Sequence, residues 1–199
     1  MWSINPFIVQ WICSYLTCRS QLVVVGGEQS SPLSVLSGVP QGSVLGPLLF
    51  LIFINEIVHQ ISPGSTMSLF ADDIALYRPI CSIEDYTTLQ NDVTAIANWV
   101  VNSLLSLQPA KCCYMVISRK RRLRLSPPPI LVESNPLLLV NIVKYLGIQI
   151  NSDLSWSPHV TNLCNKARRL IGLLYHRFYK HAASSTMLQL YESFIWPHL

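Results

Sequence analysis

The chain has 199 residues, of which half are apolar and only 12% are charged, with a net charge of +4. This length and apolar content allow the buried core of one domain or slightly more, and they exclude a disordered chain. The absence of a G-X-Y repeat, a heptad pattern and a C-x-x-C pair excludes collagen, coiled-coil and zinc or disulfide frameworks. About a quarter of residues are charged in a free-standing soluble domain, so part of this surface is expected to pack against a partner.

A helix and a hairpin are predicted at the start of the chain. Apolar residues recur with helical spacing over residues 6–18. The β-branched run 21–25 leads into Gly26-Gly27, a dipeptide typical of tight turns, and residues 33–36 would form the returning strand.

A loop rich in glycine and proline, residues 38–47, follows. An apolar helix is predicted from Pro47 to Gln60, with the proline in the first turn, where helices tolerate it. Residues 66–70 and 74–77 then indicate two short strands on either side of an acidic turn.

Ser82 is predicted to cap a long helix that ends near Leu105, because Asp85 stands at the third helical position, as in a capping box. A strand is expected over residues 113–118. It would be followed by a basic loop rich in proline, residues 119–129.

Residues 137–140 and 145–150 are predicted to pair as the strands of one hairpin. The apolar pattern becomes helical near residue 155. We therefore expect a small α/β unit over residues 1–155 and a helical unit over residues 156–199, whose two helices are separated at residues 182–185.

Asp72 and Asp73 are expected at the tip of a tight hairpin, because they stand between two apolar strands. Adjacent carboxylates repel each other unless water screens them or a cation neutralises them. Carboxylates and substrate phosphates are the usual ligands of Mg²⁺, so such a tip would suit half of a phosphoryl-transfer metal site. Because Asp is also a common turn residue, the pair taken alone is more often an ordinary turn.

The glycine-rich segment 38–48 fits none of the common phosphate-binding loops. No Lys-Ser/Thr follows its glycines, as a P-loop requires, and the spacing differs from the dinucleotide-binding fingerprint. Its flanks are too polar and too short for a membrane helix-packing face. What remains is a loop that lets a ligand approach the backbone closely, where Gln41 offers a donor and an acceptor to a base or a sugar.

Two segments in this order closely resemble the reverse transcriptases of non-LTR retrotransposons. They are residues 37–55, SGVPQGSVLGPLLFLIFIN, and residues 69–77, LFADDIALY. Residues 11–23 are similar to the stretch that precedes the glycine loop in that family, and residues 145–159 are similar to its primer grip and the entry to its thumb. The resemblance therefore covers nearly the whole chain.

The resemblance implies an α/β (α+β) fold: a polymerase palm with an antiparallel sheet and helices on one face, followed by a partial helical thumb. It also implies RNA-directed DNA polymerisation by two-metal phosphoryl transfer with Mg²⁺, or Mn²⁺ in its place. Asp72 would ligate the catalytic metal, and Asp73 would be its partner near the primer end. The partners would be an RNA template, a DNA primer and a deoxynucleoside triphosphate.

The same resemblance implies roles for further residues. Those expected near the nucleotide, the template or the primer terminus are Phe70, Gln41, Gly42 and Lys111. The primer grip would comprise Tyr145, Leu146 and Gly147.

Charge is divided unevenly along the chain. Residues 1–110 carry two basic and seven acidic side chains, and residues 111–199 carry twelve basic and three acidic ones, a balance of +9. A basic half predicts a polyanionic partner, here the phosphate backbone of a primer–template hybrid. The residues expected to contact it are Arg119, Lys120, Arg121, Arg122, Lys166, Arg168 and Arg169. Aromatic residues are interleaved with the basic residues of the predicted C-terminal helix. They are expected in the core, and they are Tyr175, Phe178 and Tyr179.

One carboxylate of the two-metal site has no match in the chain. The family supplies it from a strand upstream of the Trp11 region, but no Asp precedes Asp72, and Glu28 and Glu56 fit no family motif. We therefore expect a fragment that lacks the fingers and the first palm motif and that does not polymerise alone. The missing N-terminal part of the same element would be a further partner.

No apolar run approaches the roughly 20 residues that a membrane-spanning helix needs, so no membrane partner is expected. The cysteine pattern is typical of a reduced intracellular protein, either cytoplasmic or nuclear.

Two other interpretations remain open from the sequence. One is a non-catalytic nucleic-acid-binding remnant of a retrotransposon, based on the basic half, although the run 119–124 taken alone is more simply a solvated loop. The other is an aggregation-prone translation product without a role.

Overall fold

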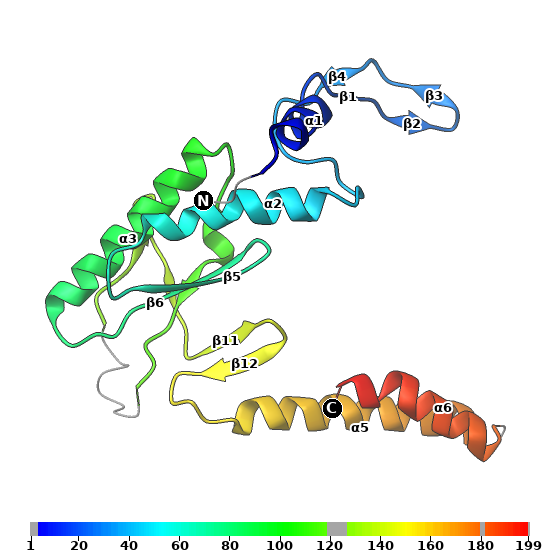
Figure 1. The fold of residues 1–199 in the computed structure, drawn as a ribbon. Coiled ribbons are helices and arrows are strands. Elements are labelled where there is room, and N and C mark those ends of the chain that lie inside the picture. The colour runs from blue at the N-terminus through cyan, green and yellow to red at the C-terminus, as the bar shows by residue number, and fades with distance from the viewer. Residues whose placement is uncertain (1–3, 119–126, 180–181, 199) are drawn as a thin grey trace. The chain divides into compact units, whose positions relative to one another are not determined.

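A computed structural model describes residues 4–118, 127–179 and 182–198. Helices alternate with short strands along the chain, which confirms the predicted α/β class (Figure 1). The chain divides into two compact units, Met1–Leu107 and Gln108–Leu199. The assignment of residues 1–155 to a palm and of the rest to a thumb stays a prediction.

The first unit begins with helix α1, Pro6–Leu16, as the apolar spacing predicted. Asn5 caps this helix, because its Oδ1 accepts a hydrogen bond from the amide of Phe7 at 3.0 Å. Pro6 occupies the first turn, where no amide donor is needed. The helix buries none of its side chains, so its apolar residues lie at the surface.

The predicted hairpin near the N-terminus forms as a ribbon of two nested antiparallel ladders. β1, Ser20–Gln21, pairs with β4, Leu33–Ser34, and β2, Val24–Val25, pairs with β3, Glu28–Gln29. Gly26-Gly27 connects β2 to β3 with φ angles of 61° and 92°. Two successive positive φ values are those of a type I′ turn, which explains the two glycines.

The predicted apolar helix forms as α2, Gly46–Ile54, continued by the 3₁₀ helix η1, Asn55–Gln60. α2 is apolar on every side, a composition typical of a helix that is buried all round. Only part of it is covered in this structure, because Leu48 and Leu51 are about half exposed while Gly46 and Ile54 are buried.

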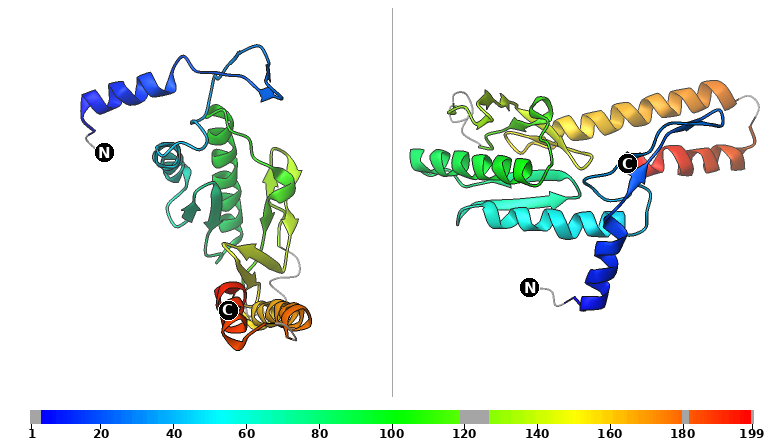
Figure 2. Two further views of the ribbon diagram at one scale, coloured as in Figure 1. Left: turned by 90° about the vertical axis from the view of Figure 1, so that its right-hand side faces the viewer. Right: turned by 90° about the horizontal axis from the view of Figure 1, so that it is seen from above.

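The acidic turn lies in a hairpin of β5, Thr66–Phe70, and β6, Asp73–Tyr77, as predicted. Helix α3, Ile83–Asn102, follows and begins with the predicted capping box of Ser82 and Asp85. In the views of Figures 1 and 2, α2 and the β5–β6 hairpin run side by side, both in the first unit.

The core of the first unit lies between this hairpin and the helices. Its buried side chains are Ile57, Ile96 and Val100. The hairpin side chains packed against them are Met67, Leu69, Ile74 and Leu76. Because these four alternate along their strands, one face of the hairpin is covered by helices and the other remains open.

The second unit begins with the 3₁₀ helix η2, Pro109–Lys111, and then contains short ladders. β7, Cys113–Tyr114, pairs in parallel with β10, Leu138–Leu139. β8, Leu131–Val132, pairs with β9, Asn135–Pro136. The strand predicted over residues 113–118 is therefore much shorter than expected.

The predicted pairing of residues 137–140 with 145–150 is wrong. The hairpin is formed by β11, Ile142–Tyr145, and β12, Ile148–Asn151, around the turn Leu146-Gly147. These two turn residues have φ angles of 48° and 88°, both positive as in a type I′ turn. Leucine is uncommon at positive φ, so the turn had no clear sequence signal.

Two helices and a final 3₁₀ segment end the second unit: α5, Ser157–Phe178, α6, Ser184–Phe194, and η3, Trp196–His198. They meet through a buried cluster of Ala167, Leu174 and Ile195, joined by Leu170 and Leu190. In the part of the chain that the structure describes, no helix is both long and apolar enough to cross a membrane.

Candidate active site

The two neighbouring carboxylates lie at the tip of the β5–β6 hairpin. Phe70 pairs with Asp73 across the ladder, so only Ala71 and Asp72 form the connecting turn. Ala71 has a φ of 52°, a left-handed conformation that costs a residue with a Cβ on the order of 1 kcal/mol or more. Strain of this kind persists where the surrounding structure imposes it, and it is concentrated at functional sites.

Strand alternation determines the direction of the side chains at the tip. Leu69 and Ile74 are opposite each other and face the core of the unit. Because successive side chains on a strand point to opposite faces, Phe70 and Asp73 lie together on the open face. Phe70 is 62% exposed, so Asp73 has an exposed aromatic ring as its cross-strand neighbour.

Asp72 lines a half-open hollow of about 340 Å³ in the first unit. Phe50 and Ile54 of α2 and the segment 104–107 after α3 line the same hollow, which is mainly apolar. The hollow thus places Asp72 beside α2, and Gln41 is not among its lining residues.

The tip offers a partial ligand set for a divalent cation. Asp72 and Asp73 are both exposed, so a hydrated ion can reach their oxygens. Carboxylate oxygens are the ligands that Mg²⁺ prefers, and Mg²⁺ usually keeps several waters or phosphate oxygens besides one or two carboxylates. Over residues 4–118, 127–179 and 182–198, no group of three or more His, Cys, Asp or Glu side chains is placed to hold a metal ion. The described chain therefore supplies two carboxylates at the tip rather than three.

The glycine loop before α2 is held by contacts within the loop itself. Ser43 donates its hydroxyl to the carbonyl of Pro40 at 2.7 Å and accepts a hydrogen bond from the amide of Gly46 at 2.9 Å. Gly38 and Gly42 have φ angles of 78° and 77°, which favour glycine. The loop thus has a defined path into α2, and its apex residues Gln41 and Gly42 are exposed.

Arg19 links the glycine loop to the end of α1. Its Nε donates to the carbonyl of Leu16 at 2.8 Å, and its Nη2 donates to the carbonyl of Gly38 at 2.5 Å. A guanidinium group suits this position because its donors lie in a rigid planar fork. The sequence places Arg19 in the stretch that precedes the loop, but this bridging role was not predicted.

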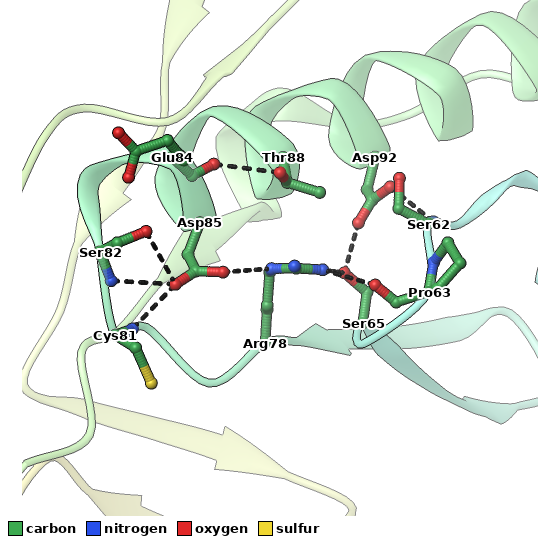
Figure 3. Close-up of polar contacts among 10 residues, drawn as sticks. All are labelled: Ser62, Pro63, Ser65, Arg78, Cys81, Ser82, Glu84, Asp85, Thr88 and Asp92. Atoms are coloured by element: carbon green, nitrogen blue, oxygen red, sulfur yellow. Dashed lines mark hydrogen bonds and ion pairs between the residues drawn. The ribbon is translucent and has the colours of Figure 1, made fainter.

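A network of polar contacts joins α3 to the base of the hairpin, in the view of Figure 3. Asp92 on α3 is 1% exposed and accepts hydrogen bonds from the amide of Ser62 at 2.8 Å and from the hydroxyl of Ser65. Arg78, just after β6, donates to Ser65 Oγ at 3.2 Å and to Asp85 Oδ1 at 3.1 Å. We call these five residues the hairpin clamp.

The clamp lowers the pKa of both of its acids. Amide hydrogen bonds from Cys81 and Ser82, and then the Arg78 side chain, lower the pKa of Asp85 from 3.8 to about 2. Burial acts to raise the pKa of Asp92, but hydrogen bonds from Ser65 and Ser62 and the charge of Arg78 outweigh it, so this pKa is also lowered. Both carboxylates are therefore ionised acceptors at neutral pH.

Asp92 was missed by the sequence reasoning, although a signal was present. It stands three residues after Leu89 and four before Ile96, on the apolar stripe of the predicted helix. An ionisable residue on a buried helix face requires hydrogen-bonding partners, and this position could have been identified on that ground.

The remaining site residues predicted from the sequence lie in the second unit. Lys111 is exposed at the end of η2. The predicted primer grip, residues 145–147, is the end of β11 and its type I′ turn. β12 is tied to α5, because the amide of Gln149 donates to Nδ1 of His159 at 3.3 Å.

The basic residues predicted on α5 are exposed; they are Lys166, Arg168 and Arg169. The predicted contacts Arg119, Lys120, Arg121 and Arg122 lie outside the described residues. α5 thus presents a basic surface to solvent, as a contact with a phosphate backbone requires.

The expectation that the aromatic residues of this helix lie in the core is wrong. Tyr175 and Tyr179 are 54% and 61% exposed, and Phe178 is also at the surface. The core positions of α5 are taken instead by Ala167 and Leu174. The prediction failed because aromatic residues at helical spacing do not reveal which face of the helix is covered.

Residues 2–150 match the model of the family described as reverse transcriptase (RNA-dependent DNA polymerase). The chain belongs to this family, which confirms the resemblance that its glycine-loop and acidic-hairpin motifs indicated.

Similar proteins come from mobile elements. Over 191 residues the chain is 28% identical to a probable RNA-directed DNA polymerase from transposon X-element of Drosophila melanogaster, covering 93% of this chain and 21% of that protein. It is 34% identical over 176 residues to a probable RNA-directed DNA polymerase from transposon BS of the same species, covering 82% of this chain and 19% of that protein. It is 30% identical over 175 residues to the RNA-directed DNA polymerase from mobile element jockey of Drosophila funebris, covering 84% of this chain and 19% of that protein.

The chain spans about a fifth of the length of these curated relatives. No solved structure matches it.

Proposed function

We propose that this chain provides the metal-binding hairpin and part of the nucleic-acid surface of an RNA-directed DNA polymerase. The observation that carries the proposal is the hairpin tip. It holds two neighbouring exposed carboxylates, one in a strained turn beside α2 and the other opposite Phe70. The family of the chain supports the same chemistry.

Asp72 and Asp73 hold the divalent cation in this proposal, and the remaining residues position the substrates. Phosphoryl transfer spreads negative charge over several oxygens, so the protein acts by positioning and by neutralising charge. Mg²⁺, or Mn²⁺ in its place, supplies positive charge at the reacting oxygens when bound. Phe70 presents its exposed ring beside Asp73, where the primer terminus would lie.

The other predicted site residues contact the nucleotide or the nucleic acid in this proposal. Gln41 at the exposed apex of the glycine loop contacts the template or the incoming deoxynucleoside triphosphate through its amide, and Gly42 leaves the backbone open beside it. Lys111 neutralises nucleotide phosphate. The turn at residues 145–147 supports the primer strand. The exposed basic residues of α5 contact the backbone of the RNA template and DNA primer.

Cation binding is the first test, with Mn²⁺ as the probe and its electron paramagnetic resonance signal as the readout. The full chain is expected to bind Mn²⁺, and Asp72→Asn and Asp73→Asn are each expected to weaken binding. Glu28→Gln removes an exposed carboxylate of the same unit and serves as the matched control. Equal Mn²⁺ affinity in the wild type and both aspartate variants would contradict the assignment.

Primer extension on a primed RNA template with Mg²⁺ is the second test. We expect no extension from this chain alone, because no Asp precedes Asp72 to supply the further carboxylate of a two-metal site. Efficient extension that Asp72→Ala abolishes would show that two carboxylates are sufficient and that this part of the proposal is wrong.

A non-catalytic nucleic-acid-binding role is the second candidate. It is favoured by α5, which carries exposed basic residues and contains no Asp or Glu. Steeply salt-dependent binding that survives Asp72→Ala, together with no Mn²⁺ binding at the hairpin tip, would support this role over the catalytic one.

A further inference from the structure

Two exposed tyrosines at the C-terminal end of α5, Tyr175 and the C-cap residue Tyr179, form a feature that the proposed function does not use. Tyr175 and Tyr179 are one helical turn apart and stack on each other, with ring centroids 4.3 Å apart and ring planes inclined by 26°. More than half of each residue is exposed. Exposed stacked aromatic rings, unlike a single surface apolar residue, present a large flat surface for a ligand.

These rings belong to a stripe that also carries positive charge. Arg168 precedes Tyr175 by seven residues, which is two helical turns, so the two side chains share one side of α5. Ile171 lies between them on the same side and is about half exposed. From Arg168 to Tyr179 the stripe is about 16 Å long, given a rise of 1.5 Å per residue.

The charge of α5 indicates the chemistry of the ligand. The helix contains four Lys or Arg residues and no Asp or Glu. A ligand that complements both features has negative charges at regular intervals and flat aromatic groups between them. Nucleic acid has this combination, with phosphates for the cations and bases for the rings.

The exposed aromatic rings favour a single-stranded ligand over a duplex. In a duplex the bases stack on one another and offer only their edges to a protein, whereas unpaired bases can stack on aromatic side chains. In the tyrosine pair each ring covers one face of the other. Because more than half of each tyrosine is still exposed, the pair has surface left on which a base could continue the stack.

We propose that Tyr175 and Tyr179 are a stacking platform for unpaired bases of a single-stranded segment of RNA or DNA, with Arg168 placed to contact its phosphates. This inference rests on the proposed nucleic-acid function and deepens it, because it assigns to α5 a single-stranded ligand beside the primer–template hybrid.

The test measures binding of the full chain to a short labelled oligothymidylate, by fluorescence anisotropy, and to the same strand with abasic sites in place of its bases. The wild type is expected to bind the base-bearing strand about tenfold more tightly, because stacking on one aromatic side chain has an effect of this size. Tyr175→Ala is expected to remove this preference, and Tyr175→Phe, which keeps the ring, is expected to retain it.

Leu173→Ala is the matched control, because it removes an exposed apolar side chain from another side of the same helix. It is expected to leave the preference unchanged. The wild type's affinities for the base-bearing and the abasic strand can be compared without any variant. A folding defect in Tyr175→Ala would therefore still leave the stacking proposal testable.

Three other outcomes would overturn the platform, and they separate its failure from that of the proposed function. If the wild type binds both strands and a blunt RNA–DNA hybrid equally well, the stacking proposal fails while the backbone contacts stand. If it binds no nucleic acid, the proposed function fails as well. If Tyr175→Ala instead converts a dimer into a monomer, this face is an interface between two copies of the chain and the platform is wrong.

Discussion

A Cβ atom at Gly46 would lie 2.8 Å from the carbonyl oxygen of Pro40 and 2.9 Å from Oγ of Ser43. Gly46 is also buried, and its amide donates to Ser43, so its neighbours cannot withdraw without breaking the contacts that shape the loop. Glycine is thus needed at this position for close packing rather than for an unusual φ. Gly46, the last glycine of the loop and the first residue of α2, therefore packs the loop against the start of the helix.

Gly46→Ala is therefore expected to lower the free energy of unfolding by about 1–3 kcal/mol, the usual cost of overpacking. Gly172→Ala is the matched control, because a Cβ there meets no atom within 4 Å. At this open helical position alanine is expected to raise stability by up to about 1 kcal/mol. Urea denaturation followed by circular dichroism measures both changes, and a destabilised Gly172→Ala or a neutral Gly46→Ala would contradict the packing account.

Arg19→Met keeps much of the aliphatic stem but removes both hydrogen bonds to Leu16 and Gly38. We expect it to loosen the glycine loop, because each lost hydrogen bond from a charged donor costs about 1.5–3 kcal/mol. Limited proteolysis with cleavage sites mapped to residues 38–45 measures the effect. Arg177→Met, a substitution of an exposed arginine on α5, should leave cleavage in this segment unchanged. Equal cleavage in both variants would show that Arg19 does not hold the loop.

At the scale of elements, the hairpin clamp connects α3 to the base of the β5–β6 hairpin, where β5 begins and β6 ends. Ser62 and Ser65 precede β5, Arg78 follows β6, and the two aspartates lie on α3. The carboxylates Asp72 and Asp73 are at the opposite end of the same hairpin. The clamp therefore holds the base of the element that carries the candidate metal ligands.

The clamp predicts how stability changes with acid. Because the folded pKa of Asp85 is about 2 against an ordinary value of 3.8, the unfolded chain binds more protons as the pH falls through this range. The stability that Asp85 contributes is complete above its ordinary pKa and is lost as the pH falls through the folded value. The lowered pKa of Asp92 acts in the same direction.

We expect Asp85→Asn to flatten the fall in the free energy of unfolding between pH 3.8 and about 2, which denaturant titrations at several pH values would measure. Glu28→Gln removes an exposed acid on β3, and its profile should follow that of the wild type. Parallel profiles for Asp85→Asn and the wild type would mean that the Arg78–Asp85 pair has no linkage to folding.

Local sequence signals predicted the elements with strong patterns and missed those that depend on distant contacts. The β5–β6 hairpin, the capped helix α3 and the loop leading into α2 followed from alternation, capping residues and proline position. The pairing of β10 with β7 did not, because two-residue strands are defined by partners far away in the chain. The Leu146-Gly147 turn also had no strong signal, since it places a leucine at positive φ.

The candidate site shows the same limit. The motifs indicated Asp72, Asp73 and Gln41, but not the arrangement in which Asp72 lines a hollow with α2 while Gln41 does not. The supporting contacts of Arg19 and Asp92 required a tertiary structure, because their acceptors and donors lie up to 30 residues away.

At the scale of the whole chain, the acidic first part and the basic second part suggest a division between a cation and a polyanion. The carboxylates of the hairpin tip belong to the first unit, and the exposed basic residues of α5 belong to the second. Each unit can therefore be tested with variants that leave the other unchanged.

Neutralising three basic residues of α5 is expected to reduce the salt dependence of nucleic-acid binding. Each phosphate contact contributes about 0.7 to 0.9 to the slope of log affinity against log salt, so replacing Lys166, Arg168 and Arg169 by Gln should reduce that slope by about two. Fluorescence anisotropy with a labelled RNA–DNA hybrid at several salt concentrations measures it. Asp72→Asn, in the other unit, should keep the wild-type slope in a buffer without divalent cations. If the triple variant kept the wild-type slope, these three residues would not make the phosphate contacts and this assignment would be wrong.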